Sequence, residues 1–118
     1  MSPLAHEIYR QLLRHLRTGK SSITYAELAA AVSKKHPTHH RSPSFHTALG
    51  ELTIACRTSK LPCLPAIVWR AAGHRPGGGY YKAAHPRART EKARLDAWAR
   101  EHADVVRDAA RFPASLPA

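Results

Sequence analysis

Acidic residues and cysteines are scarce in this sequence. Of its 118 residues, 8 are Asp or Glu, against 19 Lys or Arg, and the formal net charge is +11. Cys56 and Cys63 are the only cysteines, and a chain of this size with one possible pair is not a disulfide scaffold. We therefore expect a reducing compartment, with both cysteines buried as small apolar side chains.

Long apolar runs are also missing. No stretch approaches the ~20 uncharged apolar residues that a membrane-spanning helix needs. The first residues lack the basic region and apolar run of a secretory signal. These absences predict a cytoplasmic or nucleoid-associated protein with no membrane partner. The 118 residues suit one domain, which we place at residues 1–112, followed by a frayed C-terminal tail at residues 113–118.

The positive charge is concentrated before the last quarter of the chain. From Arg10 to Arg89 there are 14 basic residues against two acids, Glu27 and Glu51. The stretch after Arg89 mixes both signs, as a solvated helix face does. A folded domain with this much uncompensated charge repels itself, and a polyanion relieves that repulsion. The charge pattern therefore predicts a nucleic-acid partner.

Helix signals dominate the N-terminal half. Ser2 before Pro3 is a good helix start, and the apolar residues from Leu4 to Leu16 recur at helical spacing until Gly19. Thr24 and Glu27 form a capping box that starts a second helix after one residue of strand. Residues 33–42 have no apolar periodicity, which indicates an exposed loop, and Pro43 begins a third helix with an apolar stripe.

After Pro62 the residue pattern no longer predicts a helix. Residues 66–70 are rich in strand formers, residues 72–79 contain a glycine-rich turn, and Tyr80–Tyr81 is suited to a returning strand. We expect a β-hairpin in which Tyr80 and Tyr81 face opposite sides. A long closing helix follows Thr90 and ends before Pro113, and Trp69 and Trp98 are expected to be packing anchors.

The element order predicts an α+β, mostly α, winged helix-turn-helix domain. It runs helix, short strand, two helices, β-hairpin wing, long C-terminal helix. In such a domain the third helix, at about residues 43–58, lies in the DNA groove, and the wing, at about residues 66–82, contacts the flanking backbone.

Four segments resemble one known family. The chain from Ile23 to Lys92 resembles the C-terminal winged-helix domain of alkylguanine-DNA alkyltransferases and the non-enzymatic alkyltransferase-like proteins, through the segments Ile23–Ala29, His46–Gly50, Leu61–Val68 and Gly78–Tyr80. The resemblance implies a DNA-binding fold, with Cys63 at the position of the family nucleophile and His46 at that of its arginine finger.

The catalytic motif of that family is missing from this sequence. In the family a histidine directly follows the nucleophilic cysteine and activates it, whereas Leu64 and Pro65 follow Cys63. We therefore predict no enzyme activity and no cofactor. The nine histidines match no established zinc-finger spacing, so we predict no metal site either.

We predict a non-enzymatic protein that binds nucleic acid, most directly duplex DNA, as a small regulator or DNA-handling accessory factor. The alternative is a small effector or inhibitor, of the kind that mobile elements encode, whose basic face binds an acidic protein; the sequence leaves the oligomeric state open. The predicted nucleic-acid contacts come from the basic loop, the third helix and the wing: Lys34, Lys35, Arg41, His46, Thr47, Gly50, Thr53, Arg57, Arg70, His74, Arg75, Lys82, Arg87 and Arg89.

Overall fold

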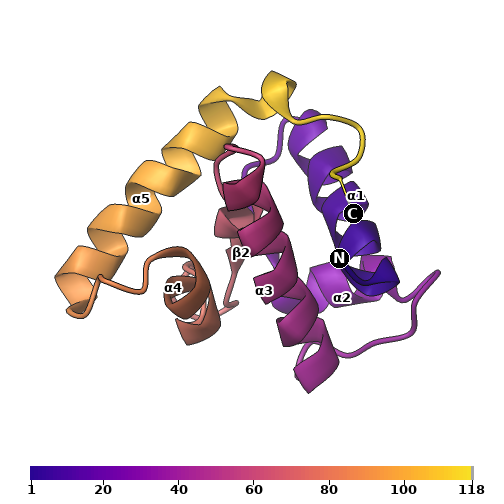
Figure 1. The fold of residues 1–118 in the computed structure, drawn as a ribbon. Coiled ribbons are helices and arrows are strands. Elements are labelled where there is room, and N and C mark those ends of the chain that lie inside the picture. Colours follow the sequence, from indigo (N-terminus) through magenta and orange to yellow (C-terminus); the bar gives the residue numbers. More distant parts are fainter. Residues whose placement is uncertain (118) are drawn as a thin grey trace.

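Helices make up most of the chain, and the fold is α+β (Figure 1). The computed structural model describes residues 1–117. Its elements are α1 (Pro3–Arg17), β1 (Ile23–Thr24), α2 (Tyr25–Val32), α3 (Pro43–Thr58), the 3-10 helix η1 (Leu64–Ile67), β2 (Val68–Trp69), α4 (Gly78–Ala84), α5 (Glu91–Arg107) and the 3-10 helix η2 (Ala109–Arg111).

The helix signals of the N-terminal half are confirmed. The Ser2 hydroxyl oxygen accepts a hydrogen bond from the Ala5 amide, and α1 stops just before Gly19, whose φ of 86° suits a residue without a Cβ. Both bonds of the Thr24–Glu27 capping box are present at the start of α2. The loop from residue 33 to 42 and the start of α3 at Pro43 are as predicted.

The predicted hairpin is wrong. Val68 and Trp69 pair in parallel with Ile23 and Thr24, across the molecule, and the described residues contain no antiparallel partner for them. Residues Gly78–Ala84, expected as the returning strand, form α4. Because α4 buries Tyr80, Tyr81 and Ala84 on one side, the two tyrosines are both 6% exposed instead of facing opposite sides of a sheet.

The helix α3 lies in the middle of the molecule. It packs against α1 on one side and against α4 on the other (Figure 1). The core fills the space between α1, α2, α3 and η1, with Ile8, Leu12, Leu28, Phe45 and Ile67 fully buried. This arrangement leaves the N-terminal end of α3 and the start of α4 beside each other at one edge.

The long closing helix, α5, is anchored by tryptophan as expected. The Trp98 Nε1–H donates a 2.9 Å hydrogen bond to the Ala66 carbonyl oxygen, and the Trp98 ring packs edge-on against Trp69, with ring centroids 5.9 Å apart. These contacts hold α5 against η1 and β2.

The segment after η2 has no helix or strand, but it contacts the core. Leu116 is buried, and the Tyr9 hydroxyl donates a hydrogen bond to the Pro113 carbonyl oxygen. Ala118, the last residue of the tail that we expected to fray, lies outside the described residues. None of the helices in residues 1–117 is long and apolar enough to cross a bilayer.

Candidate functional site

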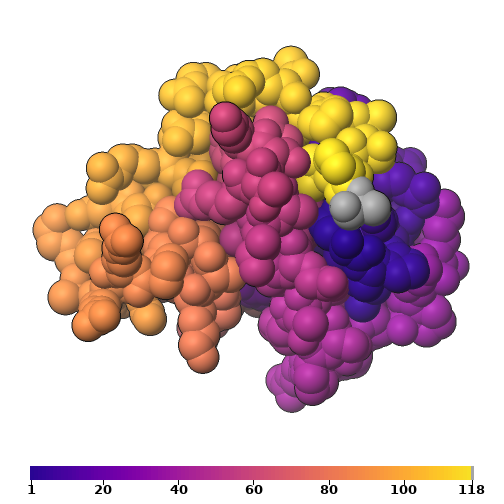
Figure 2. All heavy atoms as spheres, viewed as in Figure 1, coloured from indigo at the N-terminus to yellow at the C-terminus, as the bar shows by residue number. Residues whose placement is uncertain are grey.

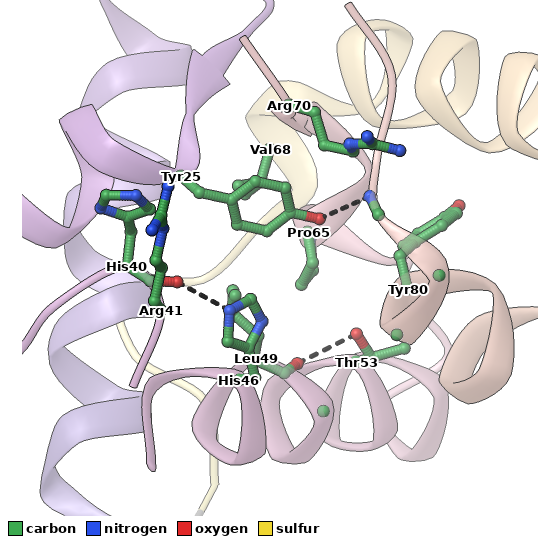
Figure 3. A pocket seen from close by; sticks show the side chains of 14 residues that line it. Tyr25, His40, Arg41, His46, Leu49, Thr53, Pro65, Val68, Arg70 and Tyr80 are labelled. Atoms are coloured by element: carbon green, nitrogen blue, oxygen red, sulfur yellow. Dashed lines mark hydrogen bonds between the residues drawn. The ribbon is translucent and has the colours of Figure 1, made fainter. Parts of the chain in front are cut away.

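A cavity of about 320 Å³ opens between α3 and the start of α4 (Figure 3). The space-filling view shows the surface hollowed between these two segments (Figure 2). The lining residues come from α2, α3, η1, β2, α4 and two loops: Tyr25, His40, Arg41, His46, Leu49, Gly50, Thr53, Pro65, Val68, Arg70, Gly77, Gly78, Gly79 and Tyr80. The cavity is thus a meeting point of elements that are far apart in the sequence.

Hydrogen bonds fix two walls of the cavity. Tyr25 extends across it from the start of α2, and its hydroxyl oxygen accepts a 2.9 Å hydrogen bond from the Gly77 amide (Figure 3). Burial raises the pKa of Tyr25, so this hydroxyl is neutral at physiological pH. His46 lies beside Tyr25, with ring centroids 5.7 Å apart. Its Nε2–H donates to the His40 carbonyl oxygen over 2.7 Å and ties α3 to the basic loop, residues 33–42.

The lining of the cavity is cationic. It contains Arg41, Arg70, His40 and His46 but no carboxylate. Neither arginine forms an ion pair with any residue in the described part of the chain. Desolvation, with the nearby charges of His39 and Arg41, holds the pKa of His40 below its usual value. Two arginines without an ion-pair partner, in a lining with no carboxylate, attract an anion.

Five of the predicted contact residues line this cavity: Arg41, His46, Gly50, Thr53 and Arg70. Thr53 is only 2% exposed, because its hydroxyl donates to the Leu49 carbonyl oxygen one turn back along α3. It is part of the cavity floor instead of the outer face of the helix. Thr47, by contrast, is exposed on α3 outside the cavity.

Two predicted contact residues have partners within the protein. Arg57 donates from Nη2 to Glu101 Oε1 over 2.7 Å and to the Ala84 carbonyl oxygen over 3.0 Å. Arg75 forms a 3.0 Å ion pair with Glu91 at the start of α5. These arginines link α3, α4 and α5, and they do not lie beside Arg41.

The other predicted residues lie elsewhere. Lys34 and Lys35 line a separate groove with α1. His74 is exposed and stacks on Trp69, with ring centroids 5.9 Å apart, while its own φ is 53°. The remaining three are exposed cations outside both hollows: Lys82, Arg87 and Arg89. The structure therefore divides the predicted contacts among several surfaces.

Sequence reasoning missed several cavity residues, above all Tyr25 and Tyr80. A signal for Tyr80 was present: the spacing Tyr80, Tyr81, Ala84 is helical, and a strand does not bury neighbouring residues on one side. No local signal identifies Tyr25, because its partner Gly77 is 52 residues away.

Both thiols are buried and poorly reactive. Cys63 is 0% exposed, its Sγ–H points at the Thr53 carbonyl oxygen 3.8 Å away, and burial strongly raises its pKa. Burial likewise raises the pKa of Cys56 to about 11. Since the thiolate is the reactive form, neither cysteine is an available nucleophile near pH 7.

Comparisons with family models, with curated proteins and with solved structures found no match to this chain.

Proposed function

We propose that this protein binds nucleic acid, most directly duplex DNA, at the face where the cavity opens, and that it does so without catalysing a reaction. The observation that carries the proposal is the cavity lining, which has two arginines and two histidines and no carboxylate. In a protein of net charge +11, a phosphate backbone matches this surface.

The interior of the cavity adds a second feature, a place for one unstacked base. Tyr25 and Tyr80 supply rings, and Leu49, Pro65 and Val68 supply apolar walls. A volume of about 320 Å³ lies within the range of small-ligand pockets. Bases taken out of a stack are held in this way, between aromatic and apolar side chains, while Arg and Lys hold the flanking phosphates.

The order α1, β1, α2, α3 supports a helix-turn-helix arrangement in which α3 is the recognition helix. Gly50 lines the cavity at the middle of α3, and Thr47 is exposed one turn before it, so both are suited to groove contacts. The loop of residues 70–77 replaces the expected hairpin as the wing. Its hydrogen bond from the Arg70 amide to the Arg75 carbonyl oxygen, 2.8 Å long, closes it as a tight turn.

The burial of the cysteines supports a binding role without alkyl transfer. We expect wild-type protein mixed with an alkylated-guanine duplex to keep its intact mass, because the Cys63 thiol is 0% exposed and its pKa is raised. Stoichiometric mass gain on Cys63, measured by mass spectrometry, would contradict this part of the proposal.

The proposal is tested by fluorescence anisotropy with two labelled duplexes, one fully paired and one with a single mismatch. A mismatched base costs less to unstack, so we expect the mismatched duplex to bind about tenfold more tightly. The double variant Arg41→Ala/Arg70→Ala should weaken binding to both duplexes by about 10- to 100-fold and lower the salt dependence.

The matched control is Arg14→Ala/Lys34→Ala, which removes the same charge from the α1 side of the molecule. It should change duplex binding less than threefold. Equal losses in the two double variants would mean that duplex binding is diffuse electrostatics, and the proposed interface would be wrong.

A further inference from the structure

A second cationic surface lies along the outer side of α1. We name it the α1 groove; it has a volume of about 650 Å³ and is lined by Glu7, Arg10, Gln11, Leu13, Arg14, Arg17, Thr18, Lys34, Lys35 and Ala114. It contains five cations and one carboxylate and shares no residue with the cavity. The groove is therefore a separate site and does not depend on the proposed nucleic-acid function.

The single carboxylate of the groove, Glu7, is already paired with a cation. Glu7 is 3% exposed, pairs with Arg10 and accepts a 2.9 Å hydrogen bond from Gln11. Although burial alone would raise the pKa of Glu7, the Gln11 hydrogen bond and the charges of Arg10 and Lys35 bring it below its usual value. Glu7 thus stays ionised, and it holds Arg10 in place.

The other cations have little compensation. Arg17 is held by the Phe112 carbonyl oxygen, to which its Nη2 donates over 3.0 Å. Arg14, Lys34 and Lys35 form no ion pair within the described residues, and all three are exposed. Like charges gathered in one hollow destabilise the free protein, and an anionic occupant removes that repulsion.

The spacing of the groove arginines along α1 indicates which kind of partner surface would match them. Arg10, Arg14 and Arg17 follow one another at four and three residues along α1. At about 1.5 Å per residue they form a row roughly 10 Å long. A second helix with carboxylates at i, i+4 and i+7 repeats that row. Arg10 and Arg17 keep their bonds to Glu7 and to the Phe112 carbonyl oxygen, whereas Arg14, Lys34 and Lys35 are free to bond the carboxylates of such a helix.

We propose that the α1 groove binds an acidic α-helix of a partner protein. A helix about 10–12 Å across enters a hollow walled by α1 and Lys34–Lys35 and reaches the exposed Ala114 between the cations.

The test uses full-length protein and a fluorescent 16-residue helical peptide with glutamates at i, i+4 and i+7, compared with a peptide in which glutamine replaces them. We expect the glutamate peptide to bind at least tenfold more tightly. The triple variant Arg14→Ala/Lys34→Ala/Lys35→Ala should lose at least tenfold in affinity for it. The control Lys82→Ala/Arg87→Ala/Arg89→Ala, of equal charge and also exposed, should lose less than twofold.

Three outcomes would overturn the proposal: no preference for the glutamate peptide, equal losses in both triple variants, or a single-stranded oligonucleotide that binds more tightly than the peptide through the same three residues. Circular dichroism confirms that each variant is folded. The Arg41→Ala/Arg70→Ala variant should keep its peptide affinity, so failure at the α1 groove and failure of the proposed nucleic-acid interface are read separately.

Discussion

The cavity and the α1 groove are both cationic, but they are built differently. The cavity is lined by tyrosine rings, glycine backbone and two arginines from separate loops, whereas the groove carries a row of long cationic side chains on one helix. Charge alone therefore does not specify the partner of a basic protein. The aromatic enclosure of the first site suits a base, and the helical spacing of the second suits a helix.

The two sites also differ in how they are supported. Tyr80 of the cavity wall bonds His85 over 3.0 Å, and Glu101 lies 3.5 Å from His85 and 2.7 Å from Arg57. This network joins α3, α4 and α5. In the groove, the hydrogen bonds and ion pair of Glu7 stay within α1. The network around Glu101 should thus depend on tertiary structure more than the Glu7 pair does, although in the groove Arg17 also bonds the distant Phe112 carbonyl oxygen.

The largest expected effect comes from the network carboxylate. Glu101→Gln removes the charge that pairs with Arg57, and we expect it to lower the free energy of unfolding by about 2–3 kcal/mol, because Glu101 is buried. Glu7→Gln should cost about 1 kcal/mol or less, because Glu7, although equally buried, has its partners Arg10 and Gln11 within one turn of the same helix. Urea denaturation measures both, and equal losses would remove the difference in support between the two sites.

A pH titration should separate the two sites next. His40 and His46 line the cavity, and no histidine lines the groove. The pKa of His40 lies below its usual value, so it gains its proton only in more acidic solution, and each proton gained favours a bound phosphate.

We therefore expect duplex affinity to rise by about tenfold between pH 8 and pH 5, on the scale of one added charge, that of His40, at about 3 Å from a phosphate in water. Anisotropy across this range, in buffers of constant ionic strength, measures the change. Peptide affinity for the groove should stay flat from pH 8 to pH 6, above the range in which the peptide glutamates gain protons, and a flat duplex curve would remove His40 from the interface.

The smallest effect is expected in the loop of residues 70–77. Arg70 lines the cavity, but Arg75 pairs with Glu91. Arg70→Ala should weaken duplex binding by about 5- to 10-fold, and Arg75→Ala by less than threefold. Competition anisotropy with both single variants gives the ratio. A larger loss of duplex affinity for Arg75→Ala than for Arg70→Ala would place Arg75 in the interface, as the sequence predicted.

Local signals predicted the first half of the fold and the closing helix after Thr90, and they failed between Pro62 and Thr90. The helix starts at Ser2, Thr24 and Pro43 depend on neighbours within three or four residues, and they are where the sequence placed them. The strand formers Val68 and Trp69 pair with a segment 45 residues earlier, which no turn residue announces. Likewise, α4 starts with two glycines, poor helix formers, and burial of its tyrosines overrides that propensity.

For the candidate site too, the sequence predicted what local signals determine and missed what long-range contacts determine. Sequence reasoning named Arg41, His46, Gly50 and Arg70, because a basic loop, an amphipathic helix and a glycine-rich turn are recognisable in one dimension. It also named Arg57, whose partner Glu101 is 44 residues away and carries no mark in the sequence. Long-range ion pairs decide which cations remain free for a partner, and only the folded chain shows them.

The most direct test of the central claim is an NMR titration of uniformly ¹⁵N-labelled protein with a mismatched duplex at moderate salt. The account predicts that the largest amide shifts fall at the cavity, on His46, Gly50 and Gly77–Gly79, and that amides of the α1 groove move little. Shifts confined to residues 10–18 and 34–35, or a uniform small shift over the whole surface, would contradict it.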